Sequence, residues 1–331
     1  MTQPAYDVVA IGNAIVDVIA RTDDAFLAEH ALTKGGMQLI DASTADLLYG
    51  QMETALEMSG GSAANTLAGL AALGKTCGFI GQVSNDQLGQ IFTHDIRALG
   101  VRFDTPPNDG GDPTARCLVL VTPDAQRTMG TFLGASQHLP ARALDDDLIR
   151  AGGILYLEGY LWDPEEPRKA MRAAIEVARA AGRKVAFTLS DGFVIERHRA
   201  DFMDLIDGGL IDILFSNEAE IQALAQQANF EKSVAAISAK VPLLISTRSE
   251  KGAIAIANGT RHEVYAAPVV EVIDTTGAGD LFAAGFLAAY VEGAEIEQCL
   301  KLGAVAAAEV ISHYGARPEA DLRALRAEAG L

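Results

Sequence analysis

The sequence predicts an α/β fold, in which a doubly wound, mostly parallel sheet is flanked by helices and carries a small β lid. Two observations lead to this prediction: apolar runs alternate regularly with amphipathic segments in the second half of the chain, and stretches of the first half are strand-like without that alternation. Parallel strands need crossover connections, and such sheets bind ligands at the carboxyl ends of their strands.

The chain opens with two β-type runs, at 6–11 and 14–20, which Gly12 and Asn13 separate. The second run contains a single acid, Asp17, and a carboxylate inside an apolar strand needs a partner or a ligand. The alternative is an Asp that faces solvent on an edge strand.

The β lid is expected from parts of residues 13–42 and 101–135. The first range carries interspersed charges around a strand-like run at 37–40, and the second reads as extended pieces around a turn. No flexible linker interrupts the chain, so we expect residues 1–331 to form one domain, with the α/β core built from the residues outside the lid.

A glycine-rich turn, Gly60-Gly61-Ser62-Ala63-Ala64-Asn65, opens a predicted helix that ends before Gly74. Its small side chains would let a ligand approach the backbone. Residues 69–76 match the P-loop pattern letter for letter, but they end a helix and run into a strand. A P-loop follows a strand and opens a helix, so we reject this match.

The second half supplies the βα alternation. The expected strands are 154–157, 184–189, 211–215 and 243–246, with helices at 165–181 and 218–227. Asn258-Gly259 predicts a hairpin between the runs that flank it.

The stretch that organises the chain is Asp274-Thr275-Thr276-Gly277-Ala278-Gly279-Asp280, which leads into a buried helix from Leu281. The first helical turn offers unpaired N–H groups and the positive end of the helix dipole, an arrangement suited to a phosphoryl group in transfer. Asp280 is placed where a carboxylate could face an incoming hydroxyl. The alternative is that Asp280 is only an N-cap and the glycines only form a turn.

Composition narrows the class of protein. With 26 basic and 44 acidic residues the formal net charge is −18, which argues against a nucleic-acid or anionic-membrane binder. The three cysteines have no metal-like or redox-like spacing and suit a reducing cytosol as core thiols. Without a leader or a membrane-length apolar run, we expect a cytoplasmic protein.

Three motifs in this order resemble the PfkB, or ribokinase-like, family of carbohydrate and nucleoside kinases: 60–65, Asn217-Glu218-Ala219-Glu220, and 274–280. The resemblance runs nearly the whole length and implies the ribokinase-like fold. Within the family it is closest to the adenosine kinases, because 12–17 and 212–218 resemble that group's first-strand and metal-site elements.

The resemblance also implies roles for individual residues. Asp280 would be the catalytic base, and the amides of Gly277, Ala278 and Gly279 would stabilise developing charge. The acceptor would be bound by Asn13, Asp17, Met37, Gly60, Gly61, Ser62, Asn65 and Tyr160. ATP would be bound by Asn217, Thr247, Ser249, Gly252, Thr276, Gly279 and His313. Asn217 and Glu220 would hold Mg²⁺ through water, and a monovalent cation such as K⁺ is a further candidate cofactor.

Four of these residues have simpler alternatives besides those already given. Asn217 and Glu220 also fit a capping box, Tyr160 fits a core aromatic, and His313 fits a helix-terminal histidine. Met37 departs from the adenosine kinase pattern, since a polar contact to the base would be expected there.

The sequence therefore leaves three functions open. The first is an adenosine kinase-like reaction, adenosine + ATP = AMP + ADP. The second is a sugar kinase acting on ribose, fructose or a sugar acid, and the third is a non-catalytic ligand sensor. The expected partners are ATP and a small acceptor, with no nucleic acid or membrane, in a monomer or homodimer.

Overall fold

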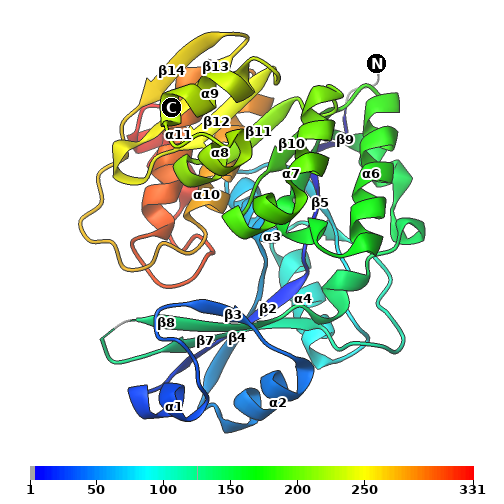
Figure 1. The fold of residues 1–331 in the computed structure, drawn as a ribbon, viewed down its shortest axis with the longest axis vertical. Coiled ribbons are helices and arrows are strands. Elements are labelled where there is room, and N and C mark those ends of the chain that lie inside the picture. The colour runs from blue at the N-terminus through cyan, green and yellow to red at the C-terminus, as the bar shows by residue number, and fades with distance from the viewer. Residues whose placement is uncertain (1–3, 125) are drawn as a thin grey trace.

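The computed structural model describes residues 4–124 and 126–331, which form two sheets and their covering helices (Figure 1). The larger sheet has the strand order β14-β13-β12-β11-β10-β9-β1-β5-β6. Its strands are β1 Tyr6–Ile11, β5 Cys77–Ile80, β6 Arg102–Phe103, β9 Gly152–Glu158, β10 Lys184–Thr188, β11 Ile213–Asn217, β12 Leu243–Thr247, β13 Ala253–Ala257 and β14 Thr260–Val264. Only the pairings of β13 with β12 and with β14 are antiparallel, so the predicted doubly wound, mostly parallel sheet is confirmed.

Helices cover both faces of this sheet because its central strands are apolar on both sides. Val8 and Ala10 of β1 pack into one buried cluster, while Val9 and Ile11 pack into the other. The first face carries α3 Ser62–Ala72, α4 Gln87–Ala98, α10 Ala278–Val291 and α11 Ile296–Val310. The second face carries α5 Asp146–Ala151, α6 Glu165–Ala180, α7 Gly192–Asp207, α8 Glu218–Ala225 and α9 Phe230–Ser238. The short α12, Leu322–Glu328, ends the chain against α3 and α11.

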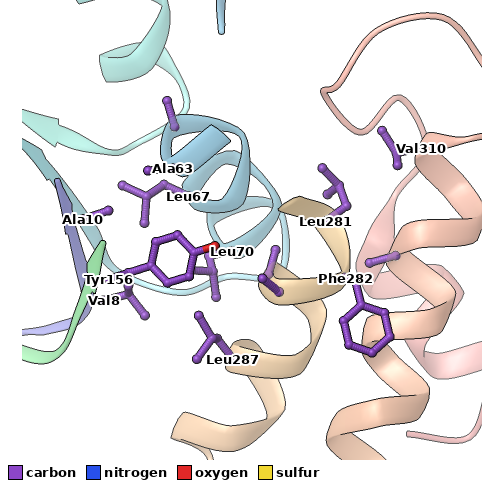
Figure 2. Packing of buried hydrophobic residues seen from close by; sticks show 14 of the residues in the cluster. Val8, Ala10, Ala63, Leu67, Leu70, Tyr156, Leu281, Phe282, Leu287 and Val310 are labelled. Carbon is purple, nitrogen blue, oxygen red and sulfur yellow. The ribbon is translucent and has the colours of Figure 1, made fainter. Parts of the chain in front are cut away.

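The helix α10 lies between α3 and α11 and is buried along its length. Figure 2 shows Leu67 and Leu70 of α3 beside Tyr156 of the sheet, with Leu287 of α10 next to them and Leu281 at the start of α10 on the side of Val310. A Cβ on Gly69 of α3 would come within 2.6 Å of Leu281, so the glycine allows the two helices to approach closely. This packing brings the N-terminal turns of α3 and α10 together.

The smaller sheet forms the lid and has the strand order β3-β8-β7-β2-β4. Its strands are β2 Ile15–Arg21, β3 Met37–Leu39, β4 Ala55–Gly60, β7 Ala115–Val121 and β8 Arg127–Phe132. Two helices, α1 Asp24–Glu29 and α2 Ala42–Gln51, lie on the side of the lid away from the large sheet (Figure 1). The opposite face of the lid therefore looks toward the core.

The lid differs in detail from the expected ranges. Strand β4 lies outside 13–42 and 101–135 but pairs with β2, while β6 lies inside the second range and pairs with β5 of the large sheet. The sequence of β4, Ala-Leu-Glu-Met-Ser-Gly, alternates too weakly to predict a strand, and its place is set by long-range pairing.

Two exclusions made from the sequence agree with the structure. The P-loop match at 69–76 ends α3 and runs into β5. Cys77, Cys117 and Cys299 are buried free thiols. Within the described residues no helix is long and apolar enough to cross a membrane.

Candidate active site

The turn before α10 is fixed by its own first residue. The Asp274 carboxylate accepts from the Thr276 N–H at 3.0 Å and hydroxyl at 2.8 Å, and from the Gly315 N–H at 3.0 Å. Gly277 adopts a left-handed φ of 77°, and the Ala278 N–H donates to the Thr275 carbonyl at 3.2 Å. The predicted turn is present, with the first-turn N–H groups of α10 directed outward from a rigid loop.

Asp280, in the first turn of α10, faces the start of α3. Its carboxylate accepts from the Ser62 hydroxyl at 2.6 Å and from the Asn65 side-chain amide at 3.1 Å. Burial raises the pKa of Asp280, while these two hydrogen bonds and the nearby Arg317 oppose that shift. The side-chain oxygen Oδ1 of Asn65 is buried without a partner among the described residues, so a hydrogen-bond acceptor is available next to Asp280.

Glu158, at the end of β9, contacts Asn13 and the first turn of α3. It accepts from the Asn13 N–H, the Asn13 side-chain amide and the Ala63 N–H, each at 2.7 Å. Burial raises its pKa to about 7, against the effect of these donors. Asn13, predicted to bind the acceptor, is thus held by Glu158 at the junction of β1, β2 and α3.

Asp17 projects from the lid strand β2 toward the same space. Burial raises its pKa to about 6, and Arg317 and Arg127 oppose the shift. A Cβ on Gly60 would overlap the Asp17 carboxylate, and one on Gly61, whose φ is 96°, would overlap the Asn13 carbonyl. Gly60 and Gly61 are therefore needed because the backbone at these positions lies too close to Asp17 and Asn13 to leave room for a side chain.

Apart from Arg21, Arg127 and Thr131, the other side chains of the lid face that carries Asp17 are apolar. Strand register places Asp17 opposite Cys117 and Met58, Cys117 opposite Thr131, and Met37 opposite Met129. Ile15, Ala115, Cys117 and Val119 form a buried cluster there, with Ile19, Val121, Met129 and Leu133 at its margin. We call this surface the inner lid face.

Two predicted acceptor residues lie at the edges of this space. Met37 is 51% exposed on the edge strand β3, on the inner lid face. Tyr160 follows β9 in the short helix Gly159–Trp162, and burial together with Asp191 and Asp280 raises its pKa. Neither residue belongs to the central core, so the alternative of a core aromatic does not hold for Tyr160, which is 37% exposed.

One lid cation reaches the turn before α10. Arg127 of β8 forms an ion pair with Asp274 through one terminal nitrogen and lies 5.0 Å from the centre of the Tyr314 ring. Its Nε and second terminal nitrogen are buried without acceptors in the described part of the chain. An anion at the turn would supply those acceptors.

Asn217 and Glu220 form the capping box that the sequence left open. The Asn217 side chain accepts from the Glu220 N–H at 2.8 Å, and the Glu220 carboxylate accepts from the Asn217 N–H at 3.0 Å and amide at 2.6 Å. Burial raises the pKa of Glu220 to about 7. The described residues contain no cluster of three or more acidic, histidine or cysteine side chains that could bind a metal directly. The pair supplies only oxygen and amide groups, which fits Mg²⁺ held through its own water.

The other predicted ATP residues are dispersed over neighbouring loops. Thr247 ends β12 beside Asn217, and Ser249 and Gly252 form the tight turn into β13 with φ of 51° and 88°. The Thr276 hydroxyl is bonded to Asp274, and the His313 ring lies 3.0 Å from the buried Glu309 carboxylate at the end of α11. His313 therefore has the helix-terminal setting that the sequence left as its alternative.

Three residues of the site were not singled out from the sequence: Glu158, Arg127 and Arg317. Glu158 ends an apolar strand, the same signal that identified Asp17, and could have been found by it. Arg317 donates to the Ser59 and Ala64 carbonyls, partners more than 250 residues away. No local pattern reports such contacts.

A carboxylate that faces the positive end of a helix, beneath a β lid, is an arrangement that can bring a hydroxyl to a phosphoryl group. The chain belongs to the pfkB family of carbohydrate kinases, whose model matches residues 6–322. It is accordingly a phosphotransferase with an alcohol group as acceptor, and the ribokinase-like fold is confirmed.

Three relatives illustrate the range of acceptors. The adenosine kinase from Sinorhizobium meliloti is 47% identical, with a TM-score of 0.91 over 98% of this chain and 99% of that one. A probable sugar kinase from Rhizobium etli CFN 42 is 45% identical, with a TM-score of 0.92 over 99% of both chains. A fructokinase from Klebsiella pneumoniae is 29% identical over 77% of this chain and 84% of its own.

Proposed function

We propose that the protein transfers the γ-phosphoryl group of ATP to the ribose 5′-hydroxyl of a purine nucleoside, with adenosine as the first candidate. The observation that supports this proposal is the largely apolar inner lid face, which carries a single carboxylate, Asp17, beside the buried cluster of Ile15, Ala115, Cys117 and Val119. A free sugar presents hydroxyls on all sides and needs polar partners for each, whereas a nucleoside presents a ribose and an apolar, stackable base.

Different residues of the site would contact the ribose and the base of a nucleoside. Asp17 and Asn65 offer oxygen acceptors for ribose hydroxyls at the junction of lid and core. Met37 and Tyr160 lie at the margins, where the base would extend between the lid and β9. The 47% identity to the S. meliloti adenosine kinase over nearly the whole chain supports the same acceptor.

In the proposed reaction Asp280 orients the 5′-hydroxyl and accepts its proton. Ser62 and Asn65 fix the carboxylate, so its free lone pairs point to one position. An aspartate is weakly basic, which suits a loose transition state in which the proton leaves the hydroxyl late. Asp17 would hold the ribose so that the hydroxyl lies in line with the phosphoryl group.

The phosphates would bind at the first turn of α10. Its N–H groups and the Arg127 guanidinium supply positive charge where the transferred group develops negative charge, and one such preorganised donor is typically worth about 3 kcal/mol. Kinases of this family use ATP with Mg²⁺. The bound Mg²⁺ would neutralise phosphate charge, and Asn217 and Glu220 would position it through water, while K⁺ remains a candidate second cation.

A free sugar is the second candidate. The buried cluster of Asn13, Glu158 and Asn65 is polar enough for a hydroxyl-rich ligand, and a probable sugar kinase is 45% identical. A non-catalytic sensor is not supported, because Asp280 keeps both of its orienting hydrogen bonds, which a sensor has no need of.

The test is ADP release from Mg²⁺-ATP with adenosine, inosine, guanosine, cytidine, ribose, fructose and 2-keto-3-deoxygluconate, using Asp280→Asn as the blank. We expect turnover confined to purine nucleosides, highest with adenosine. Turnover confined to a free sugar would contradict the acceptor assignment and leave the kinase assignment intact.

A further inference from the structure

Arg317 is a half-buried cation that acts on both Asp17 and Asp280, and it forms no ion pair with either of them. Its Nε and one terminal nitrogen donate to the Ser59 carbonyl at 3.0 and 2.7 Å, and the other terminal nitrogen donates to the Ala64 carbonyl at 2.6 Å. The Ser59 hydroxyl accepts a further bond at 3.2 Å. The guanidinium is therefore held by backbone and not by an acid.

The contacts of Arg317 join the lid strand β4 to the helix α3. Ser59 is the last residue but one of the lid strand β4, and Ala64 lies in the first turn of α3. The Ser59 N–H donates to Asp95 of α4 at 3.1 Å, so Ser59 is held from both sides. Gly60 and Gly61 lie between the two carbonyls that Arg317 binds.

Arg317 is itself positioned by contacts of its neighbouring residues with the turn before α10. The preceding Ala316 packs against Gly277, where a Cβ would lie 2.7 Å from the Ala316 Cβ. The Gly315 N–H donates to Asp274. One short loop after α11 thus links the turn before α10 to the junction of lid and α3.

We propose that Arg317 is a positioning residue, which ties the lid strand β4 to α3 and keeps Asp17 and Asp280 ionised when the acceptor site loses water. A cation bound to carbonyls retains its full charge for both carboxylates, whereas a salt-bridged cation would be neutralised by one of them. The inference rests on the proposed roles of Asp17 and Asp280, and not on the identity of the acceptor.

The electrostatic surroundings are consistent with this role. Burial lowers the pKa of Arg317 to about 10, and its attraction to Asp17, Asp280 and Asp95 opposes that shift. Reciprocally, Arg317 lowers the pKa of Asp17 and of Asp280 against burial. The charged or titratable groups coupled to Asp17, Asp280 or Arg317 come from several elements: Asp95 on α4, Cys117 on β7, Arg127 on β8, Tyr156 and Glu158 on β9, Tyr160 in the short helix after β9, and Glu220 on α8.

The first experiment compares pH profiles of kcat/KM for the wild type, Arg317→Gln and Arg317→Lys, with the best acceptor. Arg317→Gln should move the acidic limb upward by about one pH unit, because a nearby unit charge shifts a buried carboxyl by this order. Arg317→Lys, which keeps the charge, should leave the limb in place. A limb that stays in place in Arg317→Gln, whatever the loss of kcat, would reduce Arg317 to a structural residue.

Arg199→Gln is the matched control. Arg199 is also half-buried and donates to a backbone carbonyl, that of Leu224, at 2.7 Å. It lies in α7 and acts on neither Asp17 nor Asp280. Its replacement should leave the pH profile unchanged, and an equal shift in this variant would overturn the inference.

The second experiment needs no turnover and so separates this inference from the proposed function. Without Arg317, the folded-state pKa values of Asp17 and Asp280 rise further above their unfolded values, so stability is lost as the pH rises through the new range. The deficit in Tm of Arg317→Gln against wild type should therefore be larger at pH 8 than at pH 5, by at least about 2 °C. Equal deficits at the two pH values would contradict the inference even if no acceptor were turned over.

If Arg317→Gln does not fold at pH 7.5, the double variant Asp17→Asn/Arg317→Gln decides the matter. The inference attributes the failure to unbalanced carboxylates, so removing one of them should restore folding. No recovery would show that the carbonyl contacts alone matter.

Discussion

Asp280 combines three properties at the scale of a single residue: burial, two fixed hydrogen bonds and a place in the first turn of α10. We predict that Asp280→Asn folds normally and binds ATP but lowers kcat at least about a hundredfold, since a positioned general base contributes on this scale. Steady-state kinetics and ATP titration calorimetry would measure the two effects. Asp207→Asn, which removes an exposed ion pair with Lys240, serves as the control. Near-normal turnover in folded Asp280→Asn would remove Asp280 from the mechanism.

Asp17 should give the reaction a second, separable pH dependence. Its pKa of about 6 means that the carboxylate protonates as the pH falls through 6, and it then loses an acceptor for hydroxyls. We expect the KM for the acceptor to rise below pH 6, approaching tenfold per unit, while the KM for ATP changes little. In Asp17→Asn the KM for the acceptor should be high and flat in this range, and a KM in that variant that still rises would contradict the assignment.

The same shift has a consequence for stability, with a defined sign. A carboxyl whose pKa is raised on folding costs stability as the pH rises from the unfolded pKa, about 3.9, to the folded one. Wild type should thus lose stability relative to Asp17→Asn between about pH 4 and 6, and the difference should be constant above pH 7. Thermal unfolding of both proteins from pH 4 to 8 would measure this, and wild type that instead gained stability relative to Asp17→Asn as the pH rose would contradict the prediction.

Among single residues, the sequence singled out those that belong to a short contiguous motif. Asp280 and its glycines occupy one heptapeptide, and Asn65 lies in a recognisable helix start. Glu158 and Arg317 act through the backbone of segments 95 and more than 250 residues away, a relation that only the fold creates. For Asn217 and Glu220 the sequence left two roles, and the structure supplies the hydrogen bonds of one, the capping box.

At the scale of elements, α10 shows which glycines serve packing and which serve the site. A Cβ on Gly279 would meet nothing within 4 Å, whereas one on Gly69 of α3 would meet Leu281 and Ala284 at 2.6 and 2.7 Å. We predict that Gly279→Ala keeps or slightly raises Tm, because alanine favours a helix, yet lowers kcat at least tenfold by placing a methyl where the phosphate should lie.

The comparison variant is Gly69→Ala, which should lower the free energy of unfolding by about 1–3 kcal/mol through overpacking. Denaturant unfolding and kcat measured on both variants would separate the two effects. Loss of stability in Gly279→Ala, or full activity there, would contradict the role given to the first turn of α10.

The elements that the sequence predicted well are those with a strong period or a buried run. Strands β9 to β12 and helix α6 were placed to within two residues. The short helices α1 and α2 escaped prediction, because α1 has only six residues and α2 has little amphipathic character. Their places are set by contact with the lid sheet, since Leu27 and Leu48 are buried against its outer face.

At the scale of the whole molecule, the lid has a covered face and an open one. Helices α1 and α2 cover the outer face, while the inner lid face looks toward α10 and the end of β9 (Figure 1). The ion pair of Arg127 with Asp274 links the lid directly to the turn before α10. Closure of the lid on the acceptor would exclude water, which otherwise competes for the phosphoryl group. ATP hydrolysis without acceptor should then be at least a hundredfold slower than phosphoryl transfer.

The two faces can be compared directly, because each presents a leucine of similar exposure. Leu39 is 62% exposed on β3 at the edge of the inner lid face, and Leu47 is 53% exposed on α2 outside it. If the inner lid face covers a purine base, Leu39→Ser should raise the KM for adenosine about three- to tenfold, since one apolar contact of this size is worth about 1 kcal/mol, whereas Leu47→Ser should leave it unchanged. Equal KM values in the two variants would mean that the base does not lie under the lid. An effect of Leu39→Ser on the KM for ATP instead would assign this edge of the lid to the nucleotide.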